Sequence, residues 1–136
     1  MARHELAVTI EATSDQLGVV TRLARELPEL KIVVDHFGWP TDLSELAASR
    51  NVATRLDALG TIFGEWTTER VRPWLVAIVA LFGPDRCMLG SDLPIEGLRS
   101  GFEPLYQAYD EIFAGYPQRD REMLLRATAE RWYGTG

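Results

Sequence analysis

The stretch KIVVDHFGWP, residues 31–40, combines the two features that decide the fold of this protein. A run of apolar and β-branched residues, typical of a short buried strand, leads directly into an aspartate, a histidine and a glycine. A second stretch of the same design, RCMLGSDLP, follows at residues 86–94. Strands that end in polar residues predict a parallel α/β sheet with a functional site at the carboxyl ends of its strands.

Strand-like and helix-like segments alternate on either side of these two stretches. Short apolar runs predict strands at residues 6–10, 31–35, 51–57 and 86–90. Amphipathic patterns predict helices between the strands, and two more after the last strand, at about residues 102–114 and 120–133. Thr67 or Thr68 is the predicted start of the longest helix. This order predicts an α/β fold of four βα units with parallel strands and one extra C-terminal helix.

Composition excludes several classes of function. The 136 residues are 46% hydrophobic and 25% charged, as in one ordinary globular domain. Acidic residues outnumber basic ones by 20 to 14, and the net charge of −6 argues against binding to nucleic acid. The longest apolar run, residues 74–82, is too short to span a membrane. A single cysteine, Cys87, forms no internal disulfide, so a cytoplasmic location is expected.

Polar side chains gather where the predicted strands end. Because side chains alternate along a strand, three sets are each expected to share one face: Ile32, Val34 and His36; Ala53, Arg55 and Asp57; and Met88, Gly90 and Asp92. An imidazole, a carboxylate and a guanidinium at one rim suit hydrolysis, with a base for water, a polarising group and an anion anchor. The residues alone also allow structural roles: a hydrogen-bonded His36, a loop-capping Asp92, and an Arg55 that only pairs with Asp57.

Four segments taken together point to a family. They are LKIVVDHFGWP, NVATRLDALG, FGPDRCMLGSDLPIEGL and ATAERWYG, in this order along the chain. The combination resembles the amidohydrolase-2 family of TIM-barrel hydrolases, lactonases and decarboxylases, over about residues 14–134. The resemblance implies that residues 1–136 form one partial domain, the C-terminal half of a (β/α)₈ barrel with its strands five to eight, and that the N-terminal half is absent.

The resemblance also implies roles for particular residues. It places His36 and Asp92 at the catalytic positions. Arg55 and Asp57-Ala58 stand where many members have a lysine and then a Ser-Gly pair, and Arg55, Asp57 and Trp39 are expected to bind substrate. The implied reaction is hydrolysis of a small lactone, or a related ester or amide, in which Asp92 takes a proton from the attacking water. Two alternatives stay open: a catalytically incomplete fragment without turnover, and a relative of the family's metal-dependent decarboxylases.

The chain departs from the family in its metal ligands. It has no His-x-His motif, and residues 9–13, where metal-dependent members have a histidine, contain none. Since catalytic zinc usually takes three protein ligands, no tightly bound metal is expected in the isolated chain. With the missing half present, zinc becomes possible and Asp92 would be a ligand. A small-molecule substrate is expected, with no nucleic acid or membrane as partner.

The predicted half barrel has consequences for association. It leaves strand edges unpaired at residues 6–10 and 86–90, and a sheet face with nothing opposite it. The chain is therefore expected to form a homo-oligomer, or to bind a complementing N-terminal half, rather than remain a monomer.

Overall fold

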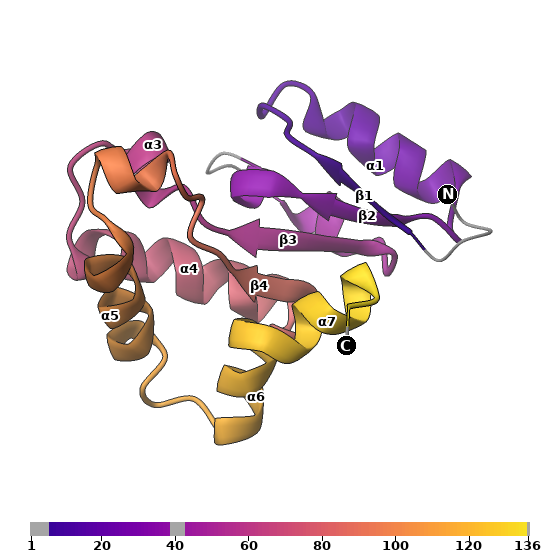
Figure 1. The fold of residues 1–136 in the computed structure, drawn as a ribbon. Coiled ribbons are helices and arrows are strands. Elements are labelled where there is room, and N and C mark those ends of the chain that lie inside the picture. Colours follow the sequence, from indigo (N-terminus) through magenta and orange to yellow (C-terminus); the bar gives the residue numbers. More distant parts are fainter. Residues whose placement is uncertain (1–5, 39–42, 136) are drawn as a thin grey trace.

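Four parallel strands in sequence order form the centre of the molecule. The computed structural model describes residues 6–38 and 43–135. Its sheet has the order β1-β2-β3-β4, as Figure 1 shows. The strands are β1 (Ala7–Ile10), β2 (Lys31–Val34), β3 (Val52–Leu56) and β4 (Cys87–Leu89). All three pairings are parallel, which confirms the predicted class and the four strands of a half barrel.

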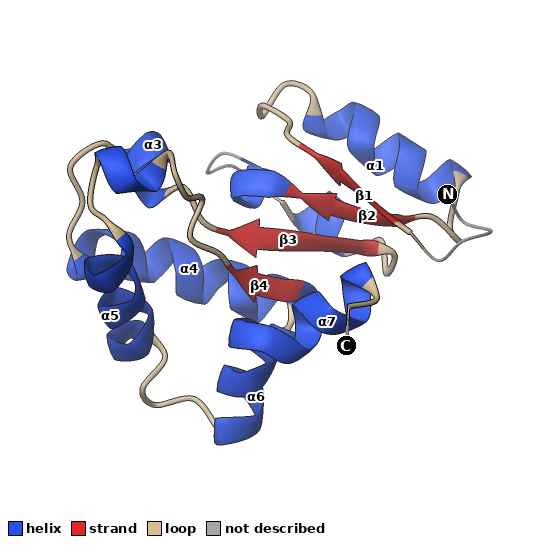
Figure 2. Cartoon of the chain, in the orientation of Figure 1, coloured by secondary structure: helices blue, strands red, loops and turns tan. Residues whose placement is uncertain are grey.

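The helices follow the predicted order with one addition (Figure 2). They are α1 (Leu17–Glu26), α2 (Ser44–Ala47), α3 (Leu59–Phe63), α4 (Thr68–Phe82), α5 (Phe102–Ile112), α6 (Gln118–Glu122) and α7 (Thr128–Tyr133), and a π-helical turn joins the last two. Helix α3 was not predicted, because five residues are too few to show a helical period. Helix α4 begins as expected, with Thr67 Oγ1 accepting a hydrogen bond from Arg70 N at 3.3 Å.

The two faces of the sheet pack against different elements. Ile32 and Val34 of β2 belong to the main core, together with Leu75 of α4. Val33 of β2, Ala53 of β3 and Met88 of β4 form a second cluster with Trp132 of α7. Strand β2 is thus buried on both faces, as expected for a central parallel strand.

These contacts confirm that Ile32 and Val34 share one face of β2, but the predicted alternation does not continue to His36. Ile32 and Val34 lie on the helix-covered face, whereas Val33 pairs in register with Ala53 and shares its face. The prediction extended the alternation through His36, but the strand ends at Val34 and a tight turn, Asp35–Gly38, begins there. Alternation applies only to extended backbone, so it says nothing about a side chain in such a turn.

The sequence predicted a sheet face with nothing packed opposite it, but in the structure this inner face is partly covered. Helix α7 lies on it, and Trp132 packs against this face while its Nε1 donates to the carbonyl of Asp85 at 3.2 Å. The cover is partial, because Arg55 on the same face keeps a side chain that is 32% exposed. Association of the chain remains a prediction. None of the helices in the described ranges is long and apolar enough to cross a membrane.

Candidate active site

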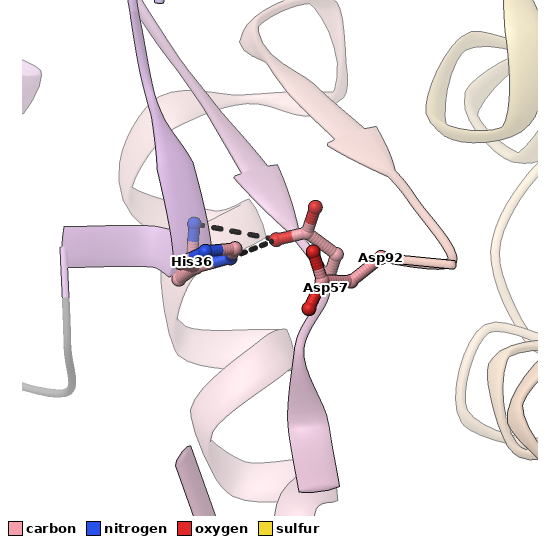
Figure 3. Close-up of side chains that lie close together, drawn as sticks. All are labelled: His36, Asp57 and Asp92. Carbon is pink, nitrogen blue, oxygen red and sulfur yellow. Dashed lines mark hydrogen bonds and ion pairs between the residues drawn. The ribbon is translucent and has the colours of Figure 1, made fainter. Parts of the chain in front are cut away.

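Non-glycine residues adopt a left-handed backbone conformation just after the carboxyl ends of three neighbouring strands. All four non-glycine residues with positive φ in the described chain lie there: His36 (53°), Phe37 (39°), Ala58 (57°) and Asp92 (51°). A side chain in this conformation costs free energy, on the order of 1–3 kcal/mol, and such strain collects at functional sites. The strained residues turn the chain sharply after β2, β3 and β4, which aims His36, Asp57 and Asp92 at one point (Figure 3).

His36 and Asp57 form a buried pair at this point. Asp57 Oδ1 lies 2.9 Å from His36 Nδ1 and accepts a further bond from the His36 backbone N–H at 3.3 Å. The two side chains are only 12% and 2% exposed. Since an ionised carboxylate only accepts hydrogen bonds, Nδ1 carries the proton and Nε2 of a neutral ring is left with a free lone pair. Asp57 therefore fixes both the orientation and the tautomer of His36.

Arg55 lies between two carboxyl groups on the inner face of the sheet. Its Nε is 2.9 Å from Asp35 Oδ1 and 3.1 Å from Asp57 Oδ2. Neither contact is aligned as a hydrogen bond, so both are ion pairs. Burial raises the pKa of Asp35, and the Arg55 guanidinium partly opposes that rise. Nε makes the contact in both ion pairs, and the terminal nitrogens of Arg55 donate no hydrogen bond to the described residues.

Asp92 completes the cluster from the loop after β4. His36, Asp57 and Asp92 each offer one nitrogen or oxygen atom, and these atoms lie within 4.8 Å of one another. Burial raises the pKa of Asp92, the nearby Asp57 raises it further, and His36 and Arg55 act in the opposite direction. Two carboxyl groups beside one imidazole form an arrangement that can take up and release a proton.

The His36–Asp57 pair predicts a pH-dependent stability. The hydrogen bond to Asp57 raises the pKa of His36 above 6.5, although burial opposes the rise. Protonated His36 is thus favoured in the folded chain, and its contribution is complete below pH 6.5 and disappears as the pH rises through the folded pKa. We expect the free energy of unfolding, measured with urea between pH 5.5 and about 9, to fall over this interval.

The matched control for this prediction is Asp57→Asn, which removes the carboxylate and keeps the side-chain shape. We expect the variant to show a flatter pH profile over the same interval, because its His36 pKa returns towards the ordinary value. Parallel profiles for the two proteins would show that this pair does not link protonation to folding.

The cluster also fits part of a divalent-metal site. With Nδ1 bonded to Asp57, His36 has Nε2 available as a ligand, and a carboxylate behind a histidine is a common support in metal sites. Asp92 offers a carboxylate oxygen within 4.8 Å of one ring nitrogen of His36. Asp57 Oδ1 is bonded to His36 Nδ1 and its Oδ2 contacts Arg55, so Asp57 supports the histidine and the ligand groups of this chain are His36 and Asp92. Catalytic zinc usually takes three protein ligands, one more than these two groups, and the absence of tight binding by the isolated chain stays a prediction.

The three predicted substrate-binding residues lie in different positions relative to the cluster. Arg55 borders the cluster and is partly exposed. Asp57 is 2% exposed, and its oxygens face His36 and Arg55, so it supports these two residues, and its contact with substrate stays a prediction. Trp39 lies outside the described residues. Sequence reasoning missed Asp35, although it directly precedes His36, because its contact with Arg55 depends on strand register.

The whole chain matches one family model. Residues 1–135 fit the model described as amidohydrolase, the amidohydrolase-2 family. The chain belongs to this family.

Individual relatives agree with the assignment to the amidohydrolase-2 family. An L-fucono-1,5-lactonase of Burkholderia ambifaria is 34% identical over 114 residues, which cover 75% of this chain and 39% of the lactonase. A Burkholderia multivorans amidohydrolase, crystallised with HEPES or with zinc, has TM-scores of 0.82 and 0.80 at 24% identity. These matches cover 93% of this chain and 53% or 52% of that one.

A decarboxylase has a related fold. The 5-carboxyvanillate decarboxylase of Sphingomonas paucimobilis has a TM-score of 0.64 at 18% identity, over 98% of this chain and 50% of that one. The chain spans less than half the length of the curated relatives that it matches, 48% of one and 39% of the other.

Proposed function

We propose that this chain carries the water-activating half of a hydrolase active site that acts on a small lactone or a related ester or amide. The observation that carries the proposal is the cluster of His36, backed by Asp57, with Asp92 beside it. A histidine held in one tautomer next to a second, partly exposed carboxyl group suits proton transfer to and from water. The similarity to an L-fucono-1,5-lactonase supports a lactone as the class of substrate.

In the proposed reaction Asp92 takes a proton from water as the water oxygen attacks the lactone carbonyl carbon. His36 holds this water or polarises the carbonyl oxygen through its ring, whose orientation Asp57 maintains. The ring C–O bond then breaks, and the proton held by Asp92 passes to the departing oxygen. The product is the open-chain hydroxy acid, which releases a proton at neutral pH. A divalent ion at His36 and Asp92, if bound, would lower the pKa of water and polarise the carbonyl.

Arg55 is proposed to bind an anionic group of the substrate. Both of its ion pairs use Nε, which leaves the terminal nitrogens for a carboxylate. We expect Arg55→Met to raise KM for a carboxylated lactone about tenfold or more, as expected for a lost charge-assisted hydrogen bond. The matched control is a neutral lactone, for which KM is expected to change little. Equal changes in KM for both lactones would argue against an anion-binding role.

The test of the reaction requires a complete barrel. We propose that a second half barrel joins this chain, and the first half of the Burkholderia ambifaria lactonase can be co-expressed with it as a substitute. A panel of lactones is then assayed for proton release, with carbon dioxide measured in parallel on aromatic carboxylates. Proton release that requires both halves supports the proposal. Carbon dioxide release would identify a decarboxylase, and the absence of either product from a well-formed complex would identify a chain without turnover.

A further inference from the structure

Glu96 has a buried carboxyl group outside the cluster of His36, Asp57 and Asp92. Its side chain is 0% exposed. One oxygen accepts from Gly60 N at 2.9 Å, and the other accepts from Gly60 N at 3.1 Å, from Trp66 Nε1 at 3.4 Å and from Ser100 Oγ. Every partner is a hydrogen-bond donor. A carboxylate suits this position because it only accepts, whereas an amide would direct its own N–H groups at other donors.

The bonds of Glu96 join two loops of the candidate active site. Its backbone N–H donates to the carbonyl of Asp92 at 3.0 Å. Its side chain holds Gly60 in the first turn of α3, and this helix begins at Leu59, two residues after Asp57. One residue therefore connects the loop that carries Asp92 with the segment that follows Asp57.

The contact between these loops has no spare room. A Cβ atom added at Gly60 would lie 2.6 Å from Arg99 Cβ and 2.9 Å from Glu96 Oε1. Such distances force the backbone or the neighbouring loop to move. Gly60 therefore permits the close approach that the bonds of Glu96 require.

We propose that Glu96 is a positioning residue that sets the separation of the Asp92 and Asp57 carboxyl groups around His36. Without its side chain, α3 loses the acceptor of its Gly60 N–H. Ala58, which is held at a φ of 57°, then relaxes and releases Asp57 from His36. This proposal rests on the proposed function in one respect, namely that His36, Asp57 and Asp92 act on water. Its test needs no turnover, so it can fail or succeed independently of the hydrolase assignment.

The test follows the His36–Asp57 bond directly by nuclear magnetic resonance of the ¹⁵N-labelled chain. The Nδ1–H proton of His36 donates to a carboxylate and is expected at low field in the wild type. In Glu96→Ala we expect loss of this signal and exchange of the Gly60 amide at least about tenfold faster. Gly60→Ala should cause the same loss of signal, because it separates the loops while retaining the carboxyl group.

The matched control is Asn51→Ala, placed just before β3 at the opposite end of the sheet. Asn51 Nδ2 donates to the carbonyls of Ala24, Leu27 and Leu30, so the variant loses stability without touching the site. It is expected to retain the His36 signal. If Glu96→Ala also retains the His36 signal while losing as much stability as Asn51→Ala, the role of Glu96 is only structural and the proposal is wrong. Should Glu96→Ala fail to fold, Glu96→Gln replaces it, and an unshifted His36 signal in that variant overturns the proposal.

Discussion

Asp92→Asn is expected to lower kcat for lactone hydrolysis by the complete barrel about 10²- to 10⁴-fold, the usual contribution of a general base. The amide keeps the size of the side chain but cannot take a proton from water. Burial raises the pKa of Asp92, which brings it closer to the range in which a carboxylate is an effective base. The measurement is initial-rate kinetics by proton release, with kcat and KM determined separately because the change should fall on kcat.

A control variant distinguishes this effect from a general disturbance of the loop. Ile95→Ala lies in the same loop, and its side chain is 55% exposed. It is expected to leave kcat within about threefold of the wild type, since exposed substitutions rarely disturb structure. If Asp92→Asn hydrolysed the lactone at nearly the wild-type rate, another group would have to be the base.

Phe37→Ala is expected to destabilise the chain by about 3–5 kcal/mol, the cost of emptying a fully buried aromatic position. Phe37 is 0% exposed, and its ring stacks on Phe63 with the centroids 6.1 Å apart. The residue also holds a φ of 39° directly after His36, so its packing supports the turn that places the imidazole. Urea unfolding at pH 6 measures the effect as a lower midpoint with an unchanged slope.

The comparison for this variant is Phe102→Ala, which removes another stacked phenylalanine. Phe102 is 54% exposed and its ring lies 4.3 Å from that of Tyr106. We expect a loss of about 1 kcal/mol or less, because most of its surface is already in water. A loss for Phe37→Ala no larger than this would mean that the turn after β2 is not anchored by core packing.

Much of the fold could be read from local sequence patterns. Residues 32–34 of β2 are a continuous β-branched apolar run, which is typical of a strand buried on both faces of a parallel sheet. Thr67 begins α4 because its hydroxyl group satisfies a free backbone N–H, which is a contact within four residues. The order of four strands followed from the alternation of these local signals, and the polar residues after β2 and β4 located the candidate site.

The tertiary structure alone decided which groups meet. Asp57 supports His36 across the ends of two strands, a pairing that depends on a strained turn at φ 53° and that no local pattern indicated. Trp132 covers the inner face of the sheet from the far end of the chain. The sequence determined the elements and their order, because hydrophobic periodicity and caps act over a few residues. Side-chain partners distant in sequence depend on register, backbone strain and packing, which exist only in the folded chain.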